Sequence, residues 1–159
     1  MAVNVAQAVL LPLAIGIIAG LRSLTAPAAV SWAARWQWLN LSHTSLSFLG
    51  HALTPWIFTV LALGELVTDK LPSTPSRTIP LSFGARIVTG GLSGGAIGAS
   101  VNALGLGLGF GVIGAILGTL GGRAFRARMA AAFRSDPPAA LLEDAIAIGG
   151  AILIVAALP

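Results

Sequence analysis

The stretch GELVTDKLP, residues 64–72, decides how this chain can fold. It places Glu65, Asp69 and Lys70 at the end of a long apolar run, in a chain with only 9% charged residues. If the run is helical, Glu65 and Asp69 are four residues apart and share one face. Two carboxylates on one face at the edge of an apolar region repel each other unless a cation or a proton lies with them. Basic side chains from elsewhere in the chain are therefore expected to reach this stretch.

The composition of the whole chain indicates an integral membrane protein. Of its 159 residues, 56% are hydrophobic, and the mean hydropathy is +0.92, whereas about a quarter of the residues in a soluble domain are charged. Several apolar runs are long enough to cross a bilayer, so the expected fold class is all-α, a polytopic membrane helical bundle. We expect one integral membrane domain over residues 1–159. Residues 1–11 carry no Lys or Arg, so the first run is not expected to be a cleaved signal peptide.

The apolar runs predict about five transmembrane helices, at roughly 5–36, 47–67, 80–99, 105–123 and 136–157. The first run is far longer than the ~20 residues that one crossing needs. One interpretation is a single tilted helix from about residue 12 to residue 32. The other is a helix that breaks after Leu21, followed by a short helix with Thr25 as its cap and Pro27 in its first turn. Both interpretations place Arg22 inside an apolar segment.

Glycines at four-residue spacing mark the third and fourth predicted helices. Such small-xxx-small faces let another helix approach closely, so a packing role is favoured over a chemical one. The glycines concerned are Gly90, Gly94 and Gly98 on the third helix and Gly107, Gly111, Gly114, Gly118 and Gly122 on the fourth.

The basic residues outside the apolar runs predict an orientation. Lys70 and Arg77 follow the second helix, and Arg123, Arg126, Arg128 and Arg134 follow the fourth, whereas the turn 100–104 carries no charge. With five crossings, the positive-inside rule places the N-terminus in the cytoplasm and the C-terminus outside. Trp32, Trp36 and Trp38 are expected to mark the opposite membrane interface.

This orientation brings the charges inside the apolar runs to one depth. Glu65, Arg86, Glu143 and Asp144 would each lie roughly one and a half to two turns below the same membrane face. Isolated charges at that depth are costly, so we expect them to face one another across the bundle, with Arg22 pairing with Glu65 or Glu143. The candidate binding or transport residues are Arg22, Glu65, Asp69, Lys70, Arg86, Glu143 and Asp144.

Three short motifs, in this order, resemble those of a known family. They are GLR at residues 20–22, Glu65 followed by DKLP at 69–72, and LED at 142–144. Together they resemble an uncharacterised domain-of-unknown-function family of small bacterial inner-membrane proteins. The resemblance implies a multi-pass protein of the bacterial inner membrane and brings no established activity.

Enzymatic activity, a cofactor and a metal site are not expected. GLSG at residues 91–94 is similar to the nucleophile motif of rhomboid-type intramembrane proteases, which need a His on a later helix. His43 and His51 both precede the motif and lie toward the face opposite the acidic residues. The absence of Cys excludes disulfides and thiolate metal sites, which leaves a hard cation held by carboxylates as an alternative.

Two functional hypotheses of different class follow from the buried charges. One is a small transporter or channel in which the Glu, Asp and Arg side chains form a site for an ion, a proton or an anionic solute. The other is a non-transporting membrane subunit, for lipid binding or assembly, in which the ion pairs are structural. The expected partners are the lipid bilayer, an ion or small anionic solute and a further copy of the chain. Nucleic acid is not expected.

Overall fold

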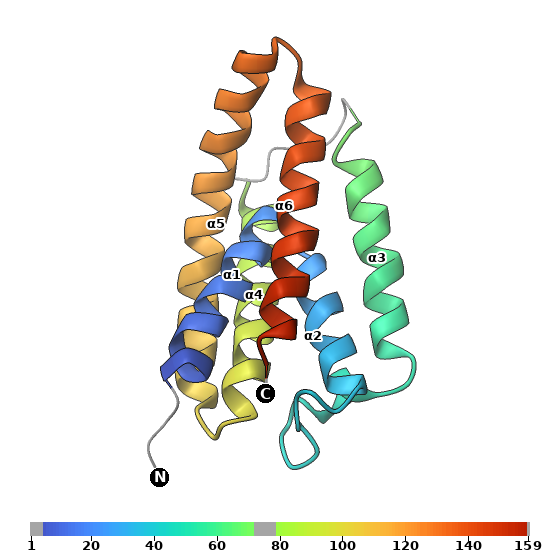
Figure 1. Ribbon diagram of the computed structural model, residues 1–159, viewed down its shortest axis with the longest axis vertical. Coiled ribbons are helices and arrows are strands. Elements are labelled where there is room, and N and C mark those ends of the chain that lie inside the picture. The colour runs from blue at the N-terminus through green and yellow to red at the C-terminus, as the bar shows by residue number, and fades with distance from the viewer. Residues whose placement is uncertain (1–4, 72–78, 159) are drawn as a thin grey trace.

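Residues 5–71 and 79–158 are described by the computed structural model shown in Figure 1. This part of the chain contains helices and no strand, which confirms the predicted all-α fold class. In chain order the elements are η1 (Ala6–Leu10), α1 (Leu11–Leu21), α2 (Thr25–Arg35), η2 (Ser47–Gly50), α3 (Thr54–Thr68), α4 (Pro80–Ala99), α5 (Leu104–Phe133) and α6 (Asp136–Ala156). Pro72 and the loop residues 73–78, including Arg77, lie outside the described residues.

The first apolar run is broken into two helices. α1 ends at Leu21, Arg22 has extended backbone torsions of φ −137° and ψ 109°, and α2 begins at Thr25. The predicted break after Leu21 is confirmed, and the alternative of one tilted helix is wrong. The cap predicted at Thr25 is also wrong, because Leu24 holds the cap position and Thr25 is already helical. Pro27 does lie in the first turn, where its missing N–H removes no helical hydrogen bond.

α2 turns back along α3. The backbone amide of Leu24, at the start of α2, donates a hydrogen bond to Glu65 near the end of α3. Near the other end of α2, the indole of Trp32 donates to the hydroxyl of Thr59 and packs edge-on against Trp56, in the first turns of α3. The two helices are therefore antiparallel, and α1 and α2 form a hairpin whose tip is the link 22–24.

α1 runs parallel to the first half of α5. A Cβ added to Gly20 would lie 2.5 Å from the carbonyl oxygen of Ala115 and 2.5 Å from the amide nitrogen of Thr119, and Gly16 meets Gly111 one turn earlier. The hairpin tip therefore lies near the middle of α5, and η1 and the end of α6 lie at the same end of the bundle (Figure 1). Five complete crossings would instead place the start of the first helix and the end of the last helix at opposite ends of the bundle.

Glycines bring the backbones of α1, α4 and α5 into contact, as their spacing predicts. A Cβ at Gly94 would lie 2.5 Å from the carbonyl oxygen of Gly107, and a Cβ at Gly98 would lie 2.8 Å from the Cα of Gly107. Gly114 and Gly118 of α5 meet the backbone of α1 in the same way. Because a side chain larger than hydrogen would meet main-chain atoms at these points, the three helices form a close-packed core.

The remaining helix boundaries agree in part with the prediction. α4 begins at Pro80, as predicted, and α6 begins at Asp136 after Ser135, which occupies the cap position without a side-chain capping bond. α3 begins at Thr54 rather than near residue 47, because residues 47–50 form the separate short helix η2.

α5 is much longer than predicted. It continues to Phe133 instead of ending near Arg123, so Arg126 and Arg128 are helical rather than in a loop. Its end is marked by Arg134, which has left-handed torsions with φ 53°. The additional turns of α5 place Arg126 beside α6, where it pairs with Asp136.

Two of the helices in the described ranges, α5 and α6, are long and apolar enough to cross a membrane. Residues 6–21 and α3 are shorter apolar helices. Their outward faces carry exposed aliphatic and aromatic side chains, such as Trp56 and Val60 on α3 and Leu153 on α6. An exposed apolar surface of this kind marks contact with lipid or protein.

Candidate functional site

The charged side chains gather at the level of the α1–α2 link. Among the described residues, all five acidic side chains and four basic ones pair with one another in two adjacent groups. Arg22, Lys70 and Arg126 connect Asp69, Asp136, Glu143 and Asp144. Arg86 pairs with Glu65, which binds the link beside Arg22. We call this set the charge cluster: Arg22, Glu65, Asp69, Lys70, Arg86, Arg126, Asp136, Glu143 and Asp144. The seven residues that the sequence predicts for a site are therefore brought together, and Arg126 and Asp136 are added to them.

Arg22 lies at the centre of the charge cluster and has no exposed surface. Its guanidinium lies 2.6 Å from Asp69 and 2.5 Å from Asp144, and 4.0 Å from Glu143. Of the two partners left open for Arg22, Glu143 is the one that the structure places beside it, although at the longest of these distances. Glu65 instead accepts hydrogen bonds from Ser23 and Leu24, the two residues that follow Arg22 in the link.

Glu65 caps the N-terminus of α2 from α3. One carboxylate oxygen accepts hydrogen bonds from the amide of Ser23 (2.8 Å) and the hydroxyl of Ser23 (2.9 Å), and the other accepts from the amide of Leu24 (2.8 Å). The first amides of a helix lack intrahelical partners, and the helix dipole favours a negative charge there. Glu65 supplies both the acceptors and the charge, in place of a capping side chain on α2.

Arg86 caps the opposite side of the same break from α4. Its Nη1 donates hydrogen bonds of 2.8 Å to the carbonyl oxygens of Gly20 and Leu21, at the end of α1. Carbonyls at a helix C-terminus lack intrahelical donors, and the dipole favours a positive charge there. Arg86 Nη2 also lies 3.8 Å from Glu65 Oε1, so the two capping side chains form a pair across the break.

Arg126 joins α5 to the charge cluster and was not predicted as a site residue. Its guanidinium donates to Asp69 and Asp136 and lies 3.7 Å from Glu143. The prediction places Arg126 in a loop, because it ends the fourth helix at residue 123. Gly118, Gly122 and Arg126 are four residues apart, so Arg126 lies on the helix face that packs against α1. This spacing is the sequence signal that would predict Arg126 as a site residue.

Asp69 and Lys70 join the end of α3 to α5 and α6. Lys70 Nζ donates to the carbonyl oxygen of Leu66 at 2.8 Å and to Asp144 Oδ2 at 2.6 Å. Burial raises the pKa of the Asp69 carboxyl, but the guanidinium groups of Arg22 and Arg126 outweigh burial and hold that pKa below its usual range. The stabilisation from ionised Asp69 is therefore lost only as the pH falls through this lowered pKa.

Glu143 is the most deeply buried acid, with 1% of its surface exposed. It lines a cavity of about 210 Å³ between α1, α5 and α6, whose other walls include Leu21, Phe125 and Ile146. Its carboxylate lies farther from its guanidinium neighbours, at 3.7 and 4.0 Å, than Asp69 and Asp144 lie from Arg22. The charge cluster thus borders an apolar cavity on its α5 side.

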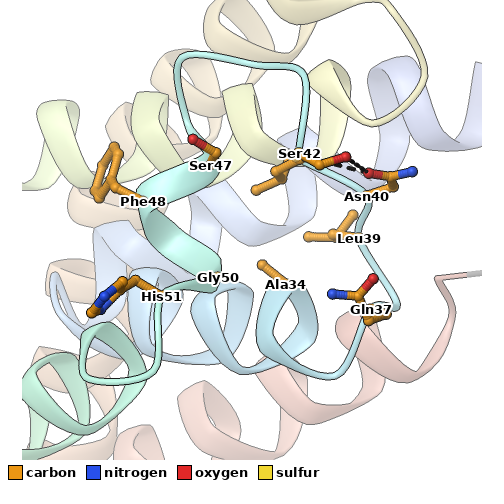
Figure 2. A pocket seen from close by; sticks show the side chains of 10 residues that line it. Ala34, Gln37, Leu39, Asn40, Ser42, Ser47, Phe48, Gly50 and His51 are labelled. Atoms are coloured by element: carbon orange, nitrogen blue, oxygen red, sulfur yellow. Dashed lines mark hydrogen bonds between the residues drawn. The ribbon is translucent and has the colours of Figure 1, made fainter.

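A second, more polar pocket lies at the opposite end of the bundle. It measures about 350 Å³ and is formed by the end of α2, the following loop and η2 (Figure 2). Gln37, Asn40, Ser42 and His51 are among its lining residues. The amide and hydroxyl of Ser42 both bond to Asn40, so part of its polar lining is already satisfied internally. None of the charge cluster lines this pocket.

Comparisons with known proteins found no family model, no curated protein and no solved structure that matches this chain. The resemblance to the bacterial inner-membrane family therefore stays a prediction. Within residues 5–71 and 79–158, no group of three His, Asp or Glu side chains is placed to hold a metal ion.

Replacing Arg22 should destabilise the protein far more than replacing Arg35, which is exposed at the end of α2. Removing one partner of a buried pair costs roughly 3–5 kcal/mol because the remaining charges are left buried, whereas an exposed change is usually within about 0.5 kcal/mol. Melting temperatures of Arg22→Ala and Arg35→Ala in one detergent measure the difference. Equal melting temperatures would contradict the central place given to Arg22.

Proposed function

We propose that this protein is a small multi-pass transporter or channel of the bacterial inner membrane, with the charge cluster as its site for a proton or a small anionic solute. The observation that carries the proposal is the helix break at residues 22–24, whose two ends meet charged side chains inside the bundle. In many transporters, the ends of interrupted helices form the substrate and ion sites, because they offer unpaired backbone groups and oriented dipoles.

The proposed membrane arrangement follows from the hairpin of α1 and α2. α3, α4, α5 and α6 cross the bilayer, and α1 and α2 enter and leave from the same face, with backbone at the break satisfied by protein groups. The end of the bundle with Lys70, Arg123, Arg128 and Arg134 faces the cytoplasm by the positive-inside rule. Both ends of the chain then face outward, which replaces the cytoplasmic N-terminus expected from five crossings.

The chemistry of the site follows from the exchange of partners at the break. If the Glu65 carboxylate moves away from the N-terminus of α2, the amides of Ser23 and Leu24 can donate hydrogen bonds to an anion in its place. Arg86, 3.8 Å from Glu65, remains beside this position as a cation. Displacement of the Glu65 carboxylate and binding of an anionic solute would thus be coupled at one place.

α3 is the element best placed to move in such a cycle. It packs along α2, and its end is joined to α5 through Asp69 and Arg126 and to α6 through Lys70 and Asp144. Changing the charge of a carboxylate at this end alters those connections directly. Ion pairs that exchange partners can therefore couple the state of the site to the position of α3.

A second candidate is a non-transporting membrane subunit whose ion pairs hold the helices in register. The observation that favours it is that each of the five acidic side chains already has a basic neighbour within 4.0 Å. Networks of this kind also occur without function.

The Glu65→Gln variant distinguishes the two candidates, because it keeps the shape of the side chain and removes the charge. The transport proposal predicts that wild type moves protons or small anions into liposomes, and that Glu65→Gln still folds but loses flux or its pH dependence. Arg35→Gln, at an exposed charge outside the cluster, is the control and should retain flux. If wild type moves no tested ion or solute and Glu65→Gln only melts earlier, the structural candidate replaces the transporter.

Topology reporters test the proposed membrane arrangement. Fusions after Ala103 and after Arg134 should report opposite compartments, because these residues lie at opposite ends of α5. Fusions at both ends of the chain should report the same compartment as the fusion after Ala103. A reporter at the first residue that agrees with the one after Arg134 would contradict the hairpin and restore a complete first crossing.

A further inference from the structure

We propose that the groove between α2, α3 and α6 binds one acyl chain of an anionic phospholipid, with the headgroup phosphate beside Lys70. The groove has a volume of about 350 Å³ and is separate from the polar pocket of Figure 2. Its lining includes Ala28, Trp32, Ala62, Leu66, Ile148 and Ala151. The proposal rests on the membrane location given above but is independent of transport.

The lining of the groove suits an alkyl chain. Small side chains, such as Ala62 on α3 and Ala151 on α6, leave the space between the helices. The indole N–H of Trp32 donates to the hydroxyl of Thr59, which itself donates to the carbonyl of Pro55, so these polar groups are satisfied within the protein. The volume is near the lower limit of the ~300–1,000 Å³ of small-ligand pockets, which fits one chain rather than two.

An ion pair lies at one end of the groove. Leu66 of α3 and Ile148 of α6 both line it, and one helical turn from each lie Lys70 and Asp144, joined at 2.6 Å. The Lys70 ammonium has three donors, of which its described contacts use two, and 36% of the side chain is exposed. A phosphate at the end of the groove can therefore accept from Lys70 without breaking its pair with Asp144.

The charge of this end of the bundle favours an anionic lipid. Arg123 and Arg128 in the second half of α5, and Arg134 directly after it, are exposed and lie beyond the level of the hairpin tip. Basic side chains near a membrane surface each contribute about 1 kcal/mol of attraction to anionic lipid. An apolar groove that ends at a cation, on the basic end of the protein, matches the chain and the headgroup of one anionic phospholipid.

Native mass spectrometry of the full chain in detergent tests the proposal. After removal of bound lipid, the protein is titrated with phosphatidylglycerol and with phosphatidylcholine of identical chains. Wild type should bind one phosphatidylglycerol, about fivefold more tightly than phosphatidylcholine. Lys70→Gln should remove this preference. Ala62→Phe fills the groove and should lose the bound lipid, whereas Leu61→Phe, at an exposed neighbouring position on α3, should keep it.

Circular dichroism and melting temperatures establish that each variant is folded. Equal binding of phosphatidylglycerol by folded Ala62→Phe and by wild type would overturn the proposal, as would equal binding of the two lipids by wild type. A dimer that Ala62→Phe abolishes while lipid binding is unchanged would overturn it in favour of a second copy of the chain in the groove. A protein that binds lipid but moves no solute would retain this inference and refute transport.

Discussion

The helix break at residues 22–24 is the constraint on which the rest of this structure depends. It leaves amides at the start of α2 and carbonyls at the end of α1 inside the bundle, where unsatisfied backbone groups are costly. Glu65 and Arg86 supply the missing acceptors and donors, and each has the charge that the adjacent helix dipole favours. The hairpin of α1 and α2, the end of α3 and the start of α4 are thus held at one point.

The glycine core determines where this point lies in the bundle. Because Gly20 packs directly on the backbone of α5 beside Thr119, the tip of the hairpin is held at the middle of that helix. The long second half of α5 then brings Arg126 to the acids of α3 and α6. Glycine packing therefore holds α1 against the first half of α5, and ion pairs join the second half of α5 to α3 and α6. Because the first half needs no charge for its contacts, most of the few charged residues lie in one cluster.

The sequence predicts the members of the cluster better than their partners. The spacing of Gly94 and Gly98 predicts a helix face packed against another helix, and the structure has that contact. The charges inside the apolar runs predict charged side chains that face one another inside the bundle, and the structure places them there. The direction of the chain after Leu21 depends on tertiary contacts to α3 and α5, which no local pattern reports. The predicted end of α5 at Arg123 is too early, because Gly121 and Gly122 before it are poor helix formers, whereas residues 124–132, rich in Ala, Arg and Met, continue the helix. Because the predicted helix ends at residue 123, Arg126 is expected in a loop and is not predicted as a site residue.

The central claim is that Glu65 caps the N-terminus of α2, and amide hydrogen exchange tests it most directly. In protein reconstituted in nanodiscs, the amides of Ser23 and Leu24 should exchange slowly, because both are hydrogen-bonded to the Glu65 carboxylate. The account predicts that Glu65→Ala accelerates their exchange and leaves the amides in the middle of α5 protected, whereas Asp136→Ala changes neither. Rapid exchange of both amides in wild type, or slow exchange that Glu65→Ala leaves unchanged, would contradict the account.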